Sequence, residues 1–170
     1  MLALADAQNA AAGFVIACFG DPGLHTLRDQ TYLAVIGIQE AAVITALTLG
    51  QRFGVISILP LWIPRHLQAF GAMGVFDRLA GDRALGLGAA DIAEPDESLA
   101  AIIATGKRIR DEDGADVLIV GSVGIAHYLD PLRDATGLPM IEPPQAVVAM
   151  ALGQTALGLS HTIERPDRAG

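Results

Sequence analysis

One stretch near the start of the chain restricts its fold more than any other. Residues 14–17 are apolar and lead into Cys18, and a turn-forming segment follows at 19–23. Such a run is typical of a strand buried on both faces, as in parallel sheets. Asp21 is expected to cap the next helix, and Pro22 fits its first position, which needs no N–H group. Cys18 is therefore expected at the carboxyl end of a strand, beside the positive end of a helix.

That position makes Cys18 a candidate for chemistry. Open α/β sheets bind ligands outside the carboxyl ends of their strands, and the positive end of a helix favours a thiolate. A free cysteine is more often a small buried hydrophobic residue, so the position alone leaves both interpretations open. Since Cys18 is the single cysteine of the chain, no internal disulfide can form, and a reducing, cytoplasmic location is expected.

Composition argues against several other classes of protein. A length of 170 residues allows one core or two small lobes. The formal net charge of -8 argues against a nucleic-acid partner, because phosphate contacts need a basic surface. No apolar run reaches the roughly 18 residues of a membrane span, and the longest, Leu33–Leu49, is interrupted by Gln39 and Glu40. The N-terminus lacks the basic region of a secretory signal.

Strand-like and helix-like segments alternate along the whole chain, which predicts an α/β fold with parallel sheet. Gly50 and Gly114 are expected to end two of the helices, the first through a left-handed cap. Strands are predicted at 14–18, 34–38, 53–58, 84–87, 117–120 and 140–141. Helices are predicted at 1–12, 22–30, 39–49, 61–73, 95–112, 125–136 and 144–157, and a loose tail at 161–170.

Two of the predicted strand ends resemble each other. Residues 13–20 and 116–124 each contain a buried strand, then a small nucleophilic residue, Cys18 or Ser122, with glycine two places later. Glycine there lets backbone N–H groups approach an anion closely. Two such loops facing each other across a cleft would make a small site for carboxylates or oxyanions, although apolar strands followed by glycine are common in α/β proteins.

These motifs resemble the hydantoin racemase branch of the aspartate/glutamate/hydantoin racemase superfamily. Residues 15–24, which contain the run CFGDPG, are similar to the first cysteine motif of that branch. The similarity covers nearly the whole chain and includes residues 35–42, 49–55, 114–121 and 137–143.

The resemblance implies an α/β fold of two pseudo-symmetric lobes, each with a parallel sheet flanked by helices and with a site between them. The lobes would comprise residues 1–49 and 50–142, and residues 143–170 would form a helix that packs back on the first lobe, plus a tail. It also implies a cofactor-independent isomerase, a racemase acting at the Cα of a hydantoin, an allantoin-like ring or an amino-acid derivative. In such enzymes one thiolate removes a proton and a second thiol returns one on the opposite face. The reference pKa of a thiol, about 8.5, is close enough to neutral for one thiol to act as the base and the other as the acid.

The site residues implied by the resemblance lie in the two loops and at the end of a third strand. Backbone N–H groups of the loops would hold the enolate in the manner of an oxyanion hole, and Ser57 matches a hydroxyl position lining the family's site. No metal ligands are expected. The implied catalytic residues are Cys18 and Ser122, and the implied substrate-binding residues are Phe19, Gly20, Ser57, Gly121, Val123 and Gly124.

The sequence departs from the family pattern in two places. Ser122 stands where the family has its second cysteine, and a hydroxyl is a far weaker acid than a thiol. The family's first strand, its Asn/Pro-rich loop and its first helix have no counterpart, which indicates a late gene start or a truncated first lobe. Such a lobe would expose a sheet edge and apolar surface, so we expect a homo-oligomer.

Two functions from different classes follow. The first is a racemase-type enzyme whose turnover is altered or impaired by Ser122. The alternative is a degenerate, non-catalytic protein that binds small molecules or another protein through the same cleft. His25 and His127, which follow the two loops, would orient a substrate in the first case, although surface histidines at such positions are common. Trp62 is expected to pack rather than to bind.

Overall fold

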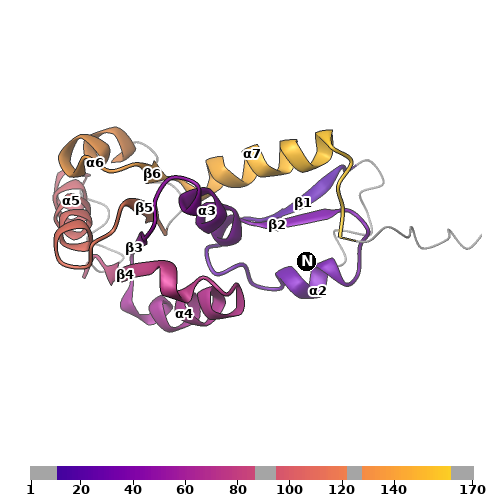
Figure 1. The fold of residues 1–170 in the computed structure, drawn as a ribbon, viewed down its shortest axis with the longest axis horizontal. Helices are drawn as coiled ribbons and strands as arrows, with labels where there is room; N and C mark the ends of the chain where they lie inside the picture. Colours follow the sequence, from indigo (N-terminus) through magenta and orange to yellow (C-terminus); the bar gives the residue numbers. More distant parts are fainter. Residues whose placement is uncertain (1–10, 87–94, 122–127, 162–170) are drawn as a thin grey trace, which may run out of the picture.

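The computed structural model describes residues 11–86, 95–121 and 128–161 and confirms an α/β fold with parallel sheets (Figure 1). A two-stranded sheet pairs β1 (Gly13–Ile16) with β2 (Ala34–Gly37). A second sheet has the order β4-β3-β5-β6, made of β3 (Phe53–Ser57), β4 (Leu79–Ala84), β5 (Val117–Val120) and β6 (Met140–Ile141). The helices are α2 (Leu24–Arg28), α3 (Ile38–Leu47), α4 (Ile63–Ala72), α5 (Pro95–Asp111), α6 (Leu129–Thr136) and α7 (Pro143–Ala156), with short 3-10 turns η1 (Pro60–Trp62) and η2 (Phe76–Arg78).

The second sheet is buried on both faces. Along β5, Val117 and Ile119 belong to one apolar cluster, whereas Leu118 and Val120 belong to another. Successive side chains of a strand point to opposite faces, so the two clusters lie on opposite sides of the sheet. The first contains residues of α3 and α4, and the second contains residues of α5 and α6. This arrangement explains why β5 is apolar throughout, as strands covered by helices on both faces are.

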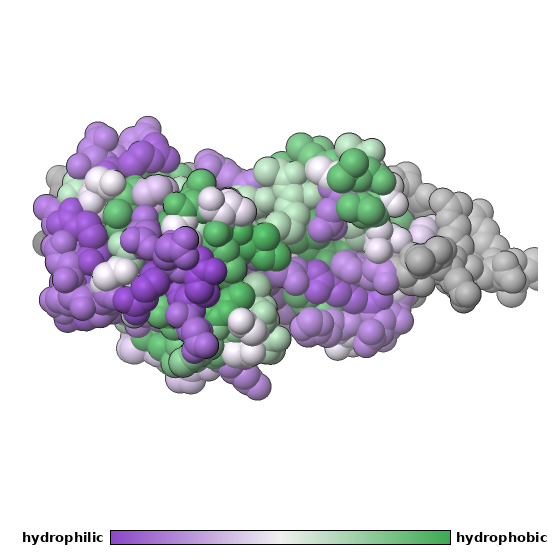
Figure 2. Space-filling view, in the orientation of Figure 1, coloured by the Kyte–Doolittle hydropathy of each residue, from purple (hydrophilic) through white to green (hydrophobic). Residues whose placement is uncertain are grey.

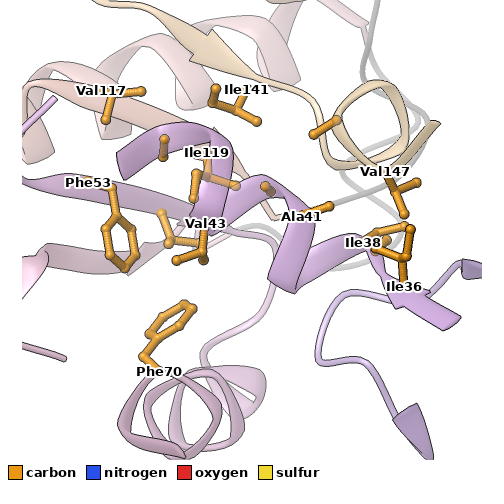
Figure 3. Packing of buried hydrophobic residues seen from close by; sticks show 14 residues of the cluster. Ile36, Ile38, Ala41, Val43, Phe53, Phe70, Val117, Ile119, Ile141 and Val147 are labelled. Atoms are coloured by element: carbon orange, nitrogen blue, oxygen red, sulfur yellow. The ribbon is translucent and has the colours of Figure 1, made fainter. Parts of the chain in front are cut away.

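Helix α3 lies at the centre of the molecule, between the two sheets (Figure 1). Its buried residues share one cluster with strands of both sheets, with Phe70 of α4 and with Val147 of α7 (Figure 3). Phe53 and Phe70 meet edge to face there, with ring centroids 5.3 Å apart. The two sheets therefore share a continuous core through α3.

The first sheet is covered by less apolar surface. Leu24 and Leu27 of α2 pack against Ile16 and Val35 in a small separate cluster. Helix α7 contacts α3, β1 and β2, and its outer face remains apolar, as Figure 2 shows over α7. The division at residues 49 and 142 into two lobes and a C-terminal helix stays a prediction.

The turn after β1 is joined to the start of α3 by one carboxylate. Asp21 accepts the backbone N–H of Gln39 on Oδ1 at 3.0 Å and that of Glu40 on Oδ2 at 2.8 Å. Gly37 leaves room for this carboxylate, because a Cβ atom at residue 37 would lie 2.1 Å from it. Burial raises the pKa of Asp21 above its ordinary value, and the two N–H donors oppose that effect. Asp21 thus caps α3 across the first sheet.

Three of the local predictions about this region and its neighbours are wrong. Asp21 does not cap the helix that follows it directly: α2 begins at Leu24, with Gly23 as its N-cap, so Pro22 is not its first residue. Helix α3 ends at Leu47 without a left-handed cap at Gly50. A glycine is needed at residue 50 for space instead, because a Cβ atom there would lie 2.8 Å from the Cβ atom of Asp116.

The strand predicted at 84–87 is also misplaced, since β4 runs from Leu79 to Ala84. Two charged residues within it, Asp82 and Arg83, conceal the pattern of a strand. Arg83 bonds both carboxylate oxygens of Asp113, at 2.6 and 2.7 Å, so its charge is paired where the sequence alone shows no partner.

The predicted loose tail begins with a residue that is tied down. His161 accepts the backbone N–H of Val35 in β2 on its Nε2 atom at 2.7 Å. The guanidinium of Arg28 donates two hydrogen bonds to the carbonyl oxygen of Val35, at 2.8 and 3.0 Å, and forms an ion pair with Glu40. Residues 162–170 and the helix predicted at 1–12, apart from its last two positions, lie outside the described residues.

Replacing Asp21 by alanine should lower the free energy of unfolding by about 1–2 kcal/mol, the usual cost of losing an N-cap. Two N–H groups at the start of α3 lose their acceptor in this variant. Urea denaturation followed by circular dichroism measures the change. Asp29→Ala is the matched control, because Asp29 is exposed at the end of α2. Equal stability of the two variants would show that the contact of Asp21 with α3 contributes nothing.

Candidate functional site

A cavity of about 310 Å³ lies where strands of both sheets end. Its wall comes from the loop after β1, from the segment between β3 and α4, and from the residue that follows β5. The lining residues are Ala17, Cys18, Phe19, Ile58, Leu59, Trp62, His66 and Gly121. The carboxyl ends of parallel strands are where open α/β sheets bind ligands, so this cavity is the candidate active site.

Cys18 is exposed in this cavity. Its thiol lies 3.8 Å from the carbonyl oxygen of Phe19, and the turn that carries it is closed by a hydrogen bond from the Asp21 N–H to the Cys18 carbonyl oxygen at 3.0 Å. A structural role as a small core residue is therefore wrong. An exposed thiol can serve as a nucleophile or a base, and the catalytic role of Cys18 stays a prediction.

The structure brings Cys18 and Gly121 to one cavity. Gly121 directly precedes the expected partner Ser122. Residues 122–127, which include Ser122, Val123 and Gly124, lie outside the described residues. Their roles at the site, and the approach of Ser122 to Cys18, stay predictions.

Phe19 connects the first loop to the second sheet. Its ring meets the His66 ring edge-on, with centroids 4.9 Å apart and an interplanar angle of 87°. A Cβ atom at Gly121 would lie 3.4 Å from the Phe19 ring and 3.2 Å from the carbonyl oxygen of Ile56. Glycine at residue 121 thus avoids close contacts with β3, and the Phe19 ring lies beside it.

Gly20 borders a different cavity, of about 550 Å³, which is also lined by Gln39 and Arg65. The backbone of Gly20 has φ = 108°, a conformation that favours glycine. Both amide atoms of Gln39 are buried without a hydrogen-bond partner among the residues that the structure describes. A role of the Phe19 and Gly20 N–H groups in holding an enolate stays a prediction.

Ser57 belongs to a buried polar cluster behind the first cavity and is not one of its lining residues. Its hydroxyl donates to Oδ1 of Asp82 at 2.5 Å and lies 3.3 Å from Nδ1 of His66. Nδ1 of His66 lies 2.8 Å from Oδ2 of Asp82. The Asp82 side chain is 1 % exposed and that of His66 is 4 % exposed. Direct contact of Ser57 with a substrate stays a prediction.

His66 is a site residue that the sequence argument missed. It lines the same cavity as Cys18. Its side-chain partners, Ser57 and Asp82, come from β3 and β4 and lie 9 and 16 residues away in the sequence, so no short motif reveals them. Asp82 lies in the strand that was placed too late. A histidine on the buried face of a helix, with an aspartate in the next strand, is the signal that could have identified the pair.

Trp62, which the sequence predicts to pack rather than to bind, lies at the surface of the protein. It is 40 % exposed and lines the cavity beside Leu59, with the Arg65 guanidinium carbon 5.0 Å from the centre of its ring. Among the described residues most of the cavity wall is apolar, and the polar side-chain groups belong to Cys18, Trp62 and His66.

In the part of the chain that the structure describes, no group of three His, Cys, Asp or Glu side chains is placed to hold a metal ion. No helix in that part is long and apolar enough to cross a membrane.

Comparisons with known proteins agree on one family. Residues 1–151 match the family model described as Asp/Glu/Hydantoin racemase. The chain is 33 % identical over 156 residues to a hydantoin racemase from Paenarthrobacter aurescens, covering 91 % of this chain and 66 % of the relative. It is 36 % identical over 153 residues to a hydantoin racemase from Rhizobium meliloti, covering 89 % and 63 %. The chain thus spans less than two thirds of the length of these relatives.

A solved structure agrees with the fold. Allantoin racemase from Pseudomonas fluorescens superposes with a TM-score of 0.85 at 28 % identity, covering 99 % of this chain and 77 % of that one.

The exposure of Cys18 predicts that iodoacetamide labels the native protein once, at a rate within about tenfold of the rate in urea. The chain has no other cysteine, so intact-mass spectrometry reads the reaction directly, and Cys18→Ser provides the blank. Labelling that occurs only after unfolding would show that the cavity does not admit a small reagent.

Proposed function

Because the chain belongs to the Asp/Glu/hydantoin racemase family, we propose that it catalyses cofactor-independent proton transfer at the Cα of a hydantoin, an allantoin-like ring or a related amino-acid derivative. The observation that carries this proposal is the exposed thiol of Cys18 in a cavity where strands of both sheets end. The relatives named hydantoin racemase and the structural neighbour named allantoin racemase support the substrate class.

The cavity suits removal of a proton from carbon. A Cα–H bond next to a carbonyl group breaks when a base takes the proton and the electron pair moves to the carbonyl oxygen. The Cys18 thiolate would be that base, and backbone N–H groups of the two loops, those of Phe19, Gly20, Val123 and Gly124, would stabilise the resulting enolate. The apolar wall around Trp62 would exclude water, so that charge–dipole interactions are stronger there than in solution.

We further propose that the chain acts on a small-molecule substrate in the cytoplasm and forms a homo-oligomer. The lone cysteine suits a reducing compartment. Exposed apolar side chains on the outer face of α7, Val148 and Leu152, favour burial against another subunit.

Incubation with 5-methylhydantoin, 5-benzylhydantoin or allantoin in deuterium oxide tests the activity. We expect deuterium at the carbon next to the carbonyl, detected by proton NMR, and we expect Cys18→Ala to slow exchange of at least one enantiomer about 10²–10⁴-fold, the usual contribution of a general base. Asp29→Ala, which changes an exposed residue of α2, should exchange at the wild-type rate. Undiminished exchange of both enantiomers in Cys18→Ala would refute the proposal.

The second candidate function is a binding protein that keeps the cavity without turnover. The serine at position 122, where the family has its second cysteine, is the observation that favours it. Ser122→Cys should raise the rate of racemisation at least about tenfold if the protein is an enzyme impaired by this residue, because a thiol is a far stronger acid than a hydroxyl. Polarimetry follows the reaction. Binding of the hydantoins without turnover in both proteins would favour the binding function.

A further inference from the structure

We propose that His66, held by Asp82, is a second proton-transfer group of the cavity that contains Cys18. This inference rests on the proposed function and names a group that can act where the second thiol is absent. Its basis is a buried Asp–His pair whose imidazole lines the same cavity as the thiol.

The first part of the argument concerns the tautomer of His66. Asp82 is acceptor-only when ionised and already receives the hydroxyl of Ser57 on Oδ1. Its Oδ2 atom lies 2.8 Å from Nδ1 of His66, so Nδ1 carries a hydrogen and donates it. A neutral His66 then has its lone pair on Nε2. This is the way in which an aspartate orients a catalytic histidine.

The second part concerns the surroundings of the ring. In residues 11–86, 95–121 and 128–161, every hydrogen bond to the His66 side chain engages Nδ1. The Phe19 and His66 rings are T-shaped, and the Phe70 ring lies 6.4 Å from that of His66 between centroids, so two aromatic rings flank the imidazole. Because Nδ1 is engaged by Asp82, we infer that Nε2 is the ring nitrogen available to the cavity that His66 lines.

The third part concerns Ser57, because serine, histidine and aspartate together suggest a hydrolase. Here the serine hydroxyl is bonded to the aspartate, and Ser57 is 1 % exposed. Both Ser57 and Asp82 lie on the Nδ1 side of the imidazole. A nucleophilic serine needs the other imidazole nitrogen and contact with the substrate. The cluster therefore orients His66 and does not itself attack a substrate.

The proposed step is balanced between the two groups. The Cys18 thiolate takes the proton from Cα, the C–H electron pair moves into the enolate, and Nε2–H of the imidazolium form of His66 delivers a proton to the opposite face. The products are the inverted substrate, the Cys18 thiol and neutral His66. Starting from the other enantiomer, neutral His66 is the base and the Cys18 thiol is the acid.

Exchange of each enantiomer in deuterium oxide separates the two bases. We expect His66→Asn to lose exchange of one enantiomer about 10²–10⁴-fold while the other still exchanges with retention, and Cys18→Ala to show the reverse preference. Asp82→Asn should resemble His66→Asn, because an amide can donate to Nδ1 and reverse the tautomer. His161→Gln, a histidine change outside the cavity, should keep both exchanges. Wild-type exchange of only one enantiomer, or full exchange of both in His66→Asn, would overturn the inference and leave the proposed function intact.

A second measurement applies even to a protein without turnover. Long-range ¹H–¹⁵N NMR spectra report the tautomer of each histidine, and His66→Asn identifies the resonances of His66. We expect the Nδ1–H form, with the Nε2 resonance shifting when 5-benzylhydantoin is added. The Nε2–H form, or no shift at hydantoin concentrations that protect Cys18 from iodoacetamide, would also overturn the inference. Absence of exchange with all three substrates in the presence of both spectral results would refute the proposed function and the proton transfer by His66 with it, and would leave only the orientation of His66 by Asp82.

Discussion

The contact of Asp21 with the start of α3 is the interaction on which the geometry of the cavity depends. The carboxylate satisfies two N–H groups that the helix itself cannot pair, and it fits only because residue 37 is glycine. Asp21 also donates its own backbone N–H to the carbonyl oxygen of Cys18. One aspartate therefore fixes the turn that presents the thiol relative to the helix at the centre of the core.

Because α3 packs against strands of both sheets, it also fixes the turn after β1 relative to the second sheet. The shared cluster around Val43, Phe53 and Phe70 joins the two sheets through one core (Figure 3). Close packing of this kind resists small displacements. The walls of the cavity come from loops; those after β3 and β5 follow strands of this core, and the one after β1 follows a strand that pairs with β2.

The parts of the fold that could be predicted from sequence are those that depend on neighbouring residues or on apolar side chains alone. The strands at 117–120 and 140–141 were predicted with the observed bounds because each is an apolar segment between turns. β4 was missed because its charges are paired by residues distant in sequence. Gln39 illustrates the same limit, since nothing in the sequence indicates that an amide interrupting an apolar run is buried. Cys18 was found through a turn motif, whereas His66 depends on three-dimensional neighbours and could not be found through spacing.

Phe19 adds a consequence for the breadth of ligands that the cavity can accept. One aromatic ring from the first loop fills the space between His66 and the bare backbone at Gly121. Trimming that ring would enlarge the cavity without moving a strand, whereas a side chain at residue 121 would press first on β3, where a Cβ atom would lie 3.2 Å from the carbonyl oxygen of Ile56 and from the Val55 side chain. Ligand size is thus adjustable at one aromatic position, whose ring also contacts His66.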